Sequence, residues 1–74
     1  MFINHTEILI TTTNAGAYAL TQKDDIYTLQ HARPGEEFKT TSTYTDEVAL
    51  IIQIKKIAPL KSWVRRPNNH VPFE

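Results

Sequence analysis

The longest apolar segment, STYTDEVALIIQIKKIAP from Ser42 to Pro59, limits most strongly what this chain can fold into. Hydroxyl and carboxylate side chains come first in it and two lysines come last, which is the order that stabilises the two ends of a helix. Pro59 then ends the run. The spacing predicts a helix over 42–58 whose N-cap is one of the early hydroxyls, Ser42, Thr43 or Thr45. Its apolar face would consist of Leu50, Ile51, Ile54, Ile57 and Ala58, widened by Val48 and Ile52.

A buried strand over 48–57 is the alternative for the same segment. The segment is rich in β-branched side chains, which favour strands: Val48, Ile51, Ile52, Ile54 and Ile57. The length of the run and the order of its charges favour the helix.

Short β-prone runs precede this segment and predict a meander of strands. The first strand is expected over 2–13, and Asn14-Ala15-Gly16 supplies the turn after it. The next two are expected at 17–23 and 26–32, with Asp24-Asp25 at the tip between them.

A two-residue turn at that tip fixes the register of the second hairpin. Leu20 would then face Leu29, Tyr18 would face His31 and Gln22 would face Tyr27, with Thr21 and Thr28 paired on the opposite face. A longer loop is the alternative, because Asp-Asp is a poorer two-residue turn than Asn-Gly.

A fourth strand is expected over 36–41, with Phe38 pointing inward, after the break at Arg33-Pro34-Gly35. After the helix, the side chains of Leu60, Trp63 and Val64 could add a last strand or cover the core.

These elements predict an α+β fold: a mostly antiparallel four-stranded sheet in β-β-β-β-α order, with one helix packed on one face and an extended C-terminal tail. Residues 1–66 would form a single compact domain and 67–74 an irregular tail, because Pro67 and Pro72 interrupt regular structure. The uncovered sheet face would carry Thr, Gln and scattered apolar side chains such as Ala19, Ile26 and Leu9. Part of it could serve as an interface or a homodimer surface.

The sequence lacks the residues that several classes of function require. The absence of cysteine excludes disulfides and thiolate metal sites. The histidines His5, His31 and His70 fit no metal spacing, and the two glycines form no phosphate-binding loop. No Ser or Thr lies in a nucleophile motif. We therefore expect no enzyme, no metal and no cofactor. Since no segment has the layout of a membrane span or a secretion signal, we expect a cytoplasmic protein.

Charge is divided unevenly along a chain whose net charge is zero. Residues 1–54 carry three basic and seven acidic side chains, whereas 55–74 carry five basic and one acidic. The basic ones, Lys55, Lys56, Lys61, Arg65 and Arg66, surround the only tryptophan, Trp63. Cations interleaved with an aromatic suit an acidic protein surface or a nucleic acid. The alternative is a solvated helix end beside a packed tryptophan.

We expect a small, non-catalytic protein-binding module of adaptor or inhibitor type, which uses this basic segment on an acidic partner. In size and layout alone, the chain is similar to small accessory proteins of phages and mobile elements, which often act by occluding a host protein. Nucleic-acid binding through the segment around Trp63 is the alternative. The net charge of zero argues against it, because dedicated nucleic-acid binders are usually basic overall.

Overall fold

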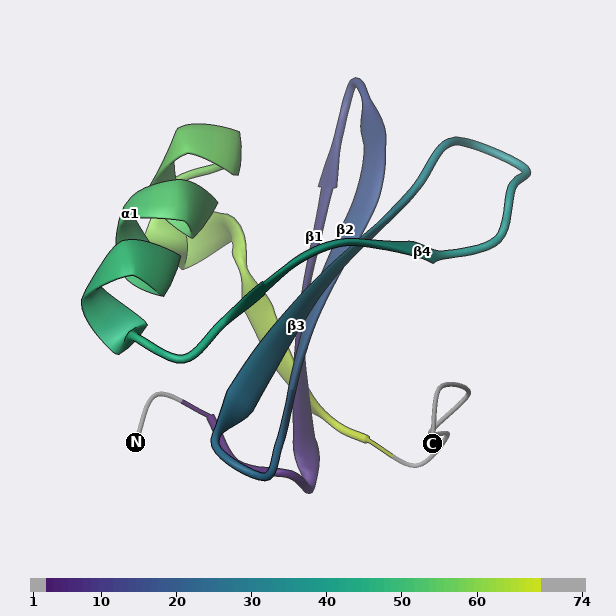
Figure 1. The fold of residues 1–74 in the computed structure, drawn as a ribbon. Helices are drawn as coiled ribbons and strands as arrows, with labels where there is room; N and C mark the ends of the chain where they lie inside the picture. Colours follow the sequence, from purple (N-terminus) through teal and green to yellow (C-terminus); the bar gives the residue numbers. More distant parts are fainter. Residues whose placement is uncertain (1–2, 69–74) are drawn as a thin grey trace.

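The computed structural model describes residues 3–68, which form an antiparallel sheet with one α-helix beside it (Figure 1). The strand order is β4-β3-β2-β1-β5, so four strands form a meander and the last one returns beside the first. In chain order the elements are β1 (Glu7–Thr13), β2 (Gly16–Lys23), β3 (Ile26–Ala32), β4 (Lys39–Tyr44), α1 (Glu47–Ile57), the 3₁₀ helix η1 (Leu60–Ser62) and β5 (Val64–Pro67).

The predicted α+β class with an antiparallel sheet and one helix is confirmed, but the predicted number of strands is wrong. The sheet has five strands, because Val64–Pro67 pairs with β1. Ile10 lies opposite Val64 and Glu7 lies opposite Pro67. The backbone N–H of Asn68 continues this ladder by donating to the carbonyl of Thr6 at 2.8 Å. Residues 69–74, most of the predicted tail, lie outside the described residues, and so does His70.

The register predicted for the second hairpin is confirmed. Leu20 lies opposite Leu29, and Tyr18 lies opposite His31. Asp24 and Asp25 form the two-residue turn with φ of 51° and 64°. A positive φ at both central positions is the backbone that matches the twist of a two-residue hairpin, and aspartate adopts it more readily than most residues.

The boundary between the fourth strand and the helix differs from the prediction. β4 covers Lys39–Tyr44 rather than 36–41, and the side chain of Phe38 is exposed rather than pointing inward. The helix begins at Glu47, and its N-cap is Asp46, whose carboxylate accepts from the N–H of Val48 at 3.0 Å. The segment Ser42-Thr43-Tyr44 pairs with β3 instead, because its β-propensity and the available strand edge outweigh its capping hydroxyls.

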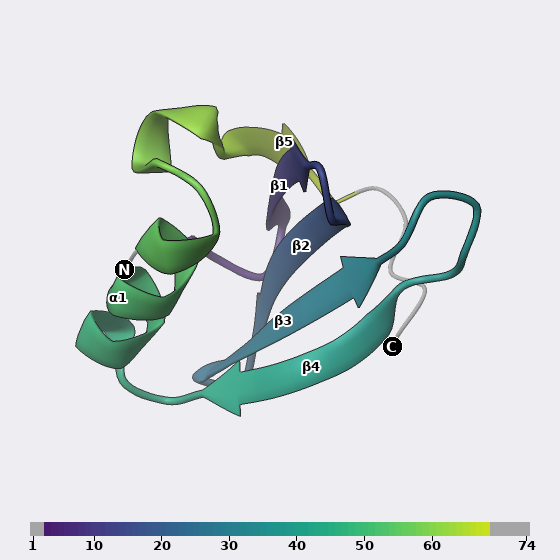
Figure 2. The same ribbon diagram turned by 90° about the horizontal axis from the view of Figure 1, so that it is seen from above.

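The buried core joins side chains of the helix and the strands. Leu50 and Ile54 have no exposed surface. They belong to one cluster with Ile3, Leu9, Leu20, Tyr27, Leu29 and Trp63. Figure 2 shows α1 on one side of the sheet. Two expectations are wrong here. Val48 and Ile52 do not widen the buried face, since they are 65% and 53% exposed, and Leu9 lies in the core rather than on the uncovered sheet face.

The other face of the sheet carries the alternate residues of the strands, and no second α-helix occurs within residues 3–68 to cover it. Ile8 and Ile10 of β1 lie on this face, because Leu9 between them faces the core. Their partners on β2, Thr21 and Ala19, are 6% and 2% exposed, so this part of the face is buried although no helix among the described residues lies on it. This face is therefore a mixture of small, hydroxyl and aliphatic side chains.

Candidate functional site

The predicted binding residues lie at the end of α1 and along the strand at one edge of the sheet. Lys55 and Lys56 occupy the last turn of α1, Lys61 lies in η1, and two arginines lie on β5. All of these cationic side chains are exposed. We call the set Lys55, Lys56, Lys61, Arg65 and Arg66 the basic edge.

Trp63 lies among these residues in the sequence, but its side chain is buried whereas theirs are exposed. Its side chain is only 7% exposed and belongs to the core cluster. The indole Nε1–H lies 3.3 Å from the carbonyl oxygen of Ile54 and 3.2 Å from that of Ala58, and donates to both. The indole is packed, as in the alternative of a solvated helix end beside a packed tryptophan, and partner binding by this segment stays a prediction. The indole therefore anchors the basic edge to the helix rather than offering a free stacking face.

Lys55 and Lys56 have a structural reason to lie where they do. The C-terminal end of a helix carries partial negative charge on its unpaired carbonyls, and cations in the last turn offset it. A partner is therefore not needed to explain these two lysines.

Arg65 and Arg66 project from opposite faces of the sheet. Arg65 pairs with Leu9 and Arg66 pairs with Ile8, and successive strand residues point in opposite directions. Arg65 thus lies on the side of the helix, where its Nε is 3.6 Å from Oε2 of Glu7. The two side chains are 56% and 26% exposed, so this ion pair contributes little to stability.

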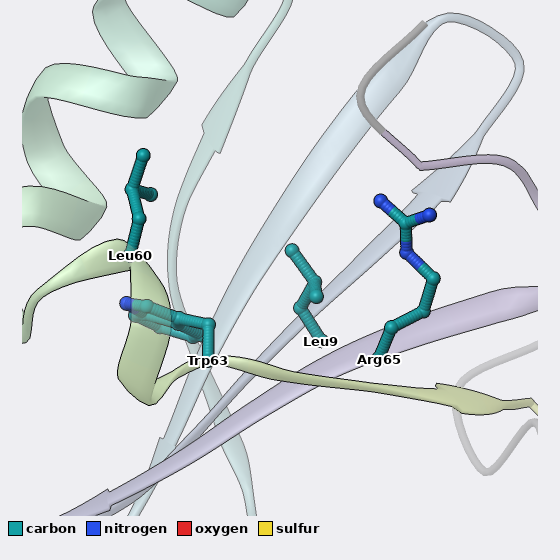
Figure 3. A pocket seen from close by; sticks show the side chains of 4 residues that line it. All are labelled: Leu9, Leu60, Trp63 and Arg65. Atoms are coloured by element: carbon teal, nitrogen blue, oxygen red, sulfur yellow. The ribbon is translucent and has the colours of Figure 1, made fainter.

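A pocket of about 330 Å³ opens beside Trp63 on the helix side of β5 (Figure 3). Leu9, Leu60, Trp63 and Arg65 line it. The position of η1 that creates it is fixed by Thr11, whose hydroxyl donates to the carbonyl of Ser62 at 3.0 Å. Trp63 and Arg65 are among the predicted binding residues. Leu60 was expected to add to a last strand or to cover the core, and Leu9 comes to this place only through the pairing of β1 with β5.

The other ionisable side chains that could have formed a site have structural roles instead. The His31 ring stacks on Tyr18 with centroids 4.4 Å apart, and its Nε2 donates to the carbonyl of Ala15 at 2.7 Å. Asp24 and Asp25 form a turn, and Asp46 caps a helix. Within residues 3–68, no group of three or more His, Asp or Glu side chains is arranged to hold a metal ion.

Comparisons with protein-family models, with curated proteins and with solved structures gave no match to this chain. Among the described residues, α1 and η1 are both too short to cross a membrane. The function is therefore argued from the chemistry of the site.

Proposed function

We propose that this chain is a small, non-catalytic protein-binding module of adaptor or inhibitor type, which holds an acidic protein surface against its basic edge. The observation that carries the proposal is the exposure of all the basic-edge cations at one edge of the sheet and the adjoining helix end. Complementary charge steers association and fixes the orientation of partners. As in small phage-like accessory proteins, binding would act by covering part of a host protein.

The burial of Trp63 favours a protein partner over a nucleic acid. Binding of single strands relies on aromatic faces on which bases stack. An indole that is 7% exposed, with its N–H bonded to the helix end, has no open face on which a base could stack. The cations alone would give only weak binding to phosphates, which depends strongly on salt and is independent of the nucleotide sequence.

Capture from a cell lysate, with and without nuclease, tests the class of partner. The variant Arg65→Glu/Arg66→Glu reverses two charges of the basic edge. Its matched control, Lys23→Glu/Lys39→Glu, changes the net charge equally, at the exposed ends of β2 and β4. We expect a protein that survives nuclease, binds the control variant and is lost from the Arg65/Arg66 variant.

Three results would contradict the proposal or part of it. Loss of capture after nuclease treatment favours the nucleic-acid alternative. Equal capture by both double variants removes the basic edge as the site and makes the uncovered sheet face the leading surface. A sedimentation experiment that shows a stable homodimer through that face would point to self-association instead.

A further inference from the structure

We propose that the pocket beside Trp63 receives an aliphatic side chain of the partner while Arg65 binds the carboxylate of a neighbouring aspartate or glutamate. This inference rests on the proposed function, and it identifies which part of an acidic partner would be recognised. The pocket is defined by Leu9, Leu60, Trp63 and Arg65 (Figure 3).

The apolar part of the pocket suits an aliphatic side chain. Leu9 and Trp63 are almost completely buried and belong to the core, so they form a fixed floor. Leu60 is 39% exposed and lies at the rim, where a ligand would cover it. The volume of about 330 Å³ is within the range of small ligand sites, about 300–1,000 Å³. Covering Leu60 removes apolar surface from water, which is favourable.

The charged part of the pocket suits a carboxylate. Among the described residues that line it, Arg65 is the one that carries a charge, and its Nε lies 3.6 Å from Oε2 of Glu7. A guanidinium carries five N–H donors in a planar fork, so it can serve more than one acceptor at the same time. The exposed Lys61, which follows Leu60 in η1, adds to the positive charge of this region.

An acidic side chain fits better than a C-terminal carboxylate. Terminal carboxylates are commonly held by successive backbone N–H groups. At the end of η1 the N–H groups of Ser62 and Trp63 are already engaged, because Ser62 donates to Pro59 at 2.8 Å and Trp63 donates to Leu60 at 3.1 Å. Recognition by a side-chain guanidinium does not require such a backbone site.

Titration of the isolated protein with short blocked peptides, followed by two-dimensional NMR, tests this inference without any partner. The probe is acetyl-Leu-Glu-amide. Acetyl-Leu-Gln-amide removes only its charge, and acetyl-Gly-Glu-amide removes only its aliphatic side chain. We expect saturable shifts of the Trp63 indole N–H and of the Leu60 and Arg65 amides with the first peptide. Each control peptide should bind at least about fivefold more weakly, since each lacks one of the two contacts.

Matched variants assign the two contacts. Arg65→Gln should abolish the preference for the Glu peptide over the Gln peptide, whereas Arg66→Gln, on the opposite sheet face, should preserve it. Leu60→Ser should weaken both peptides. Equal binding of the Glu and Gln peptides, shifts outside the pocket, or an equal effect of the two arginine variants would overturn the inference. Because no partner is present, these results are independent of the capture experiment, which can succeed with an acidic protein that leaves the pocket empty.

Discussion

The indole Nε1–H of Trp63 lies 3.2 Å from the carbonyl oxygen of Ala58, at the C-cap of α1. The same N–H is 3.3 Å from the carbonyl of Ile54. The carbonyl of Ile54 already accepts from the N–H of Ala58 at 3.0 Å. The carbonyl of Ala58 lies beyond the last turn, where a buried carbonyl is costly if it remains unpaired. A single side chain next to β5 therefore satisfies the end of the helix and connects it to the edge of the sheet.

Replacement of Trp63 by phenylalanine should lower the free energy of unfolding by about 1–3 kcal/mol, because it removes this buried donor and leaves a void. Urea denaturation measures the loss. Val64→Ala, at the next and half-exposed position, should change stability by no more than about 0.5 kcal/mol. An unchanged denaturation midpoint for Trp63→Phe would show that the indole N–H contributes nothing net.

Gly16, at the start of β2, cannot be replaced by alanine without a rearrangement. Its φ is +117°, and a Cβ there would lie 2.2 Å from the carbonyl oxygen of Ala32 on β3. Backbone strain and the clash together should cost about 2–5 kcal/mol. Gly35 is a matched control, because its φ is +81° but a Cβ there meets nothing within 4 Å. Thermal denaturation should therefore show a much smaller loss for Gly35→Ala, and equal losses would contradict the contact with Ala32.

The β2–β3 hairpin could be predicted from the sequence because its information is local. Leu20 and Leu29 lie on either side of a two-residue turn, and their alternation with polar residues allows one register that gathers the apolar side chains on one face. The helix was predictable for the same reason, since the Leu50–Ile54 spacing and the two terminal lysines lie within one segment.

The features that could not be predicted depend on contacts between residues that are far apart in the sequence. Val64–Pro67 has little strand character by itself and becomes β5 by pairing with β1. Ser42 and Thr43 resemble helix caps but pair with β3. The separation of Arg65 and Arg66 onto opposite faces follows from β5, so the sequence suggested one basic surface where the structure has two sides. The pocket, which needs Leu9, could not be predicted for the same reason.

The two faces of α1 offer a direct test of the core. Ile54 is fully buried and Ile52 is 53% exposed, although both are isoleucines in the same helix. Ile54→Asp should unfold the protein, since burying an unpaired charge costs several kcal/mol, which is comparable with the whole stability of a small domain. Ile52→Asp should leave the circular dichroism spectrum and the melting temperature nearly unchanged. If Ile54→Asp folds and melts as the parent chain does, the assignment of the buried face is wrong.

The basic edge predicts a particular dependence of partner binding on salt. Charges at exposed positions interact over about 10 Å at 0.1 M salt and about 3 Å at 1 M, so affinity should fall steadily across this range. Arg65→Glu/Arg66→Glu should bind more weakly and with a flatter dependence on salt. Its melting temperature should stay close to that of the parent chain, since the ion pair with Glu7 is partly exposed and such pairs contribute little to stability. The control Lys23→Glu/Lys39→Glu should keep the parent slope. Calorimetric titrations of the captured partner at several salt concentrations measure these slopes. Equal slopes for the parent chain and the Arg65/Arg66 variant would place the partner on another surface of the molecule.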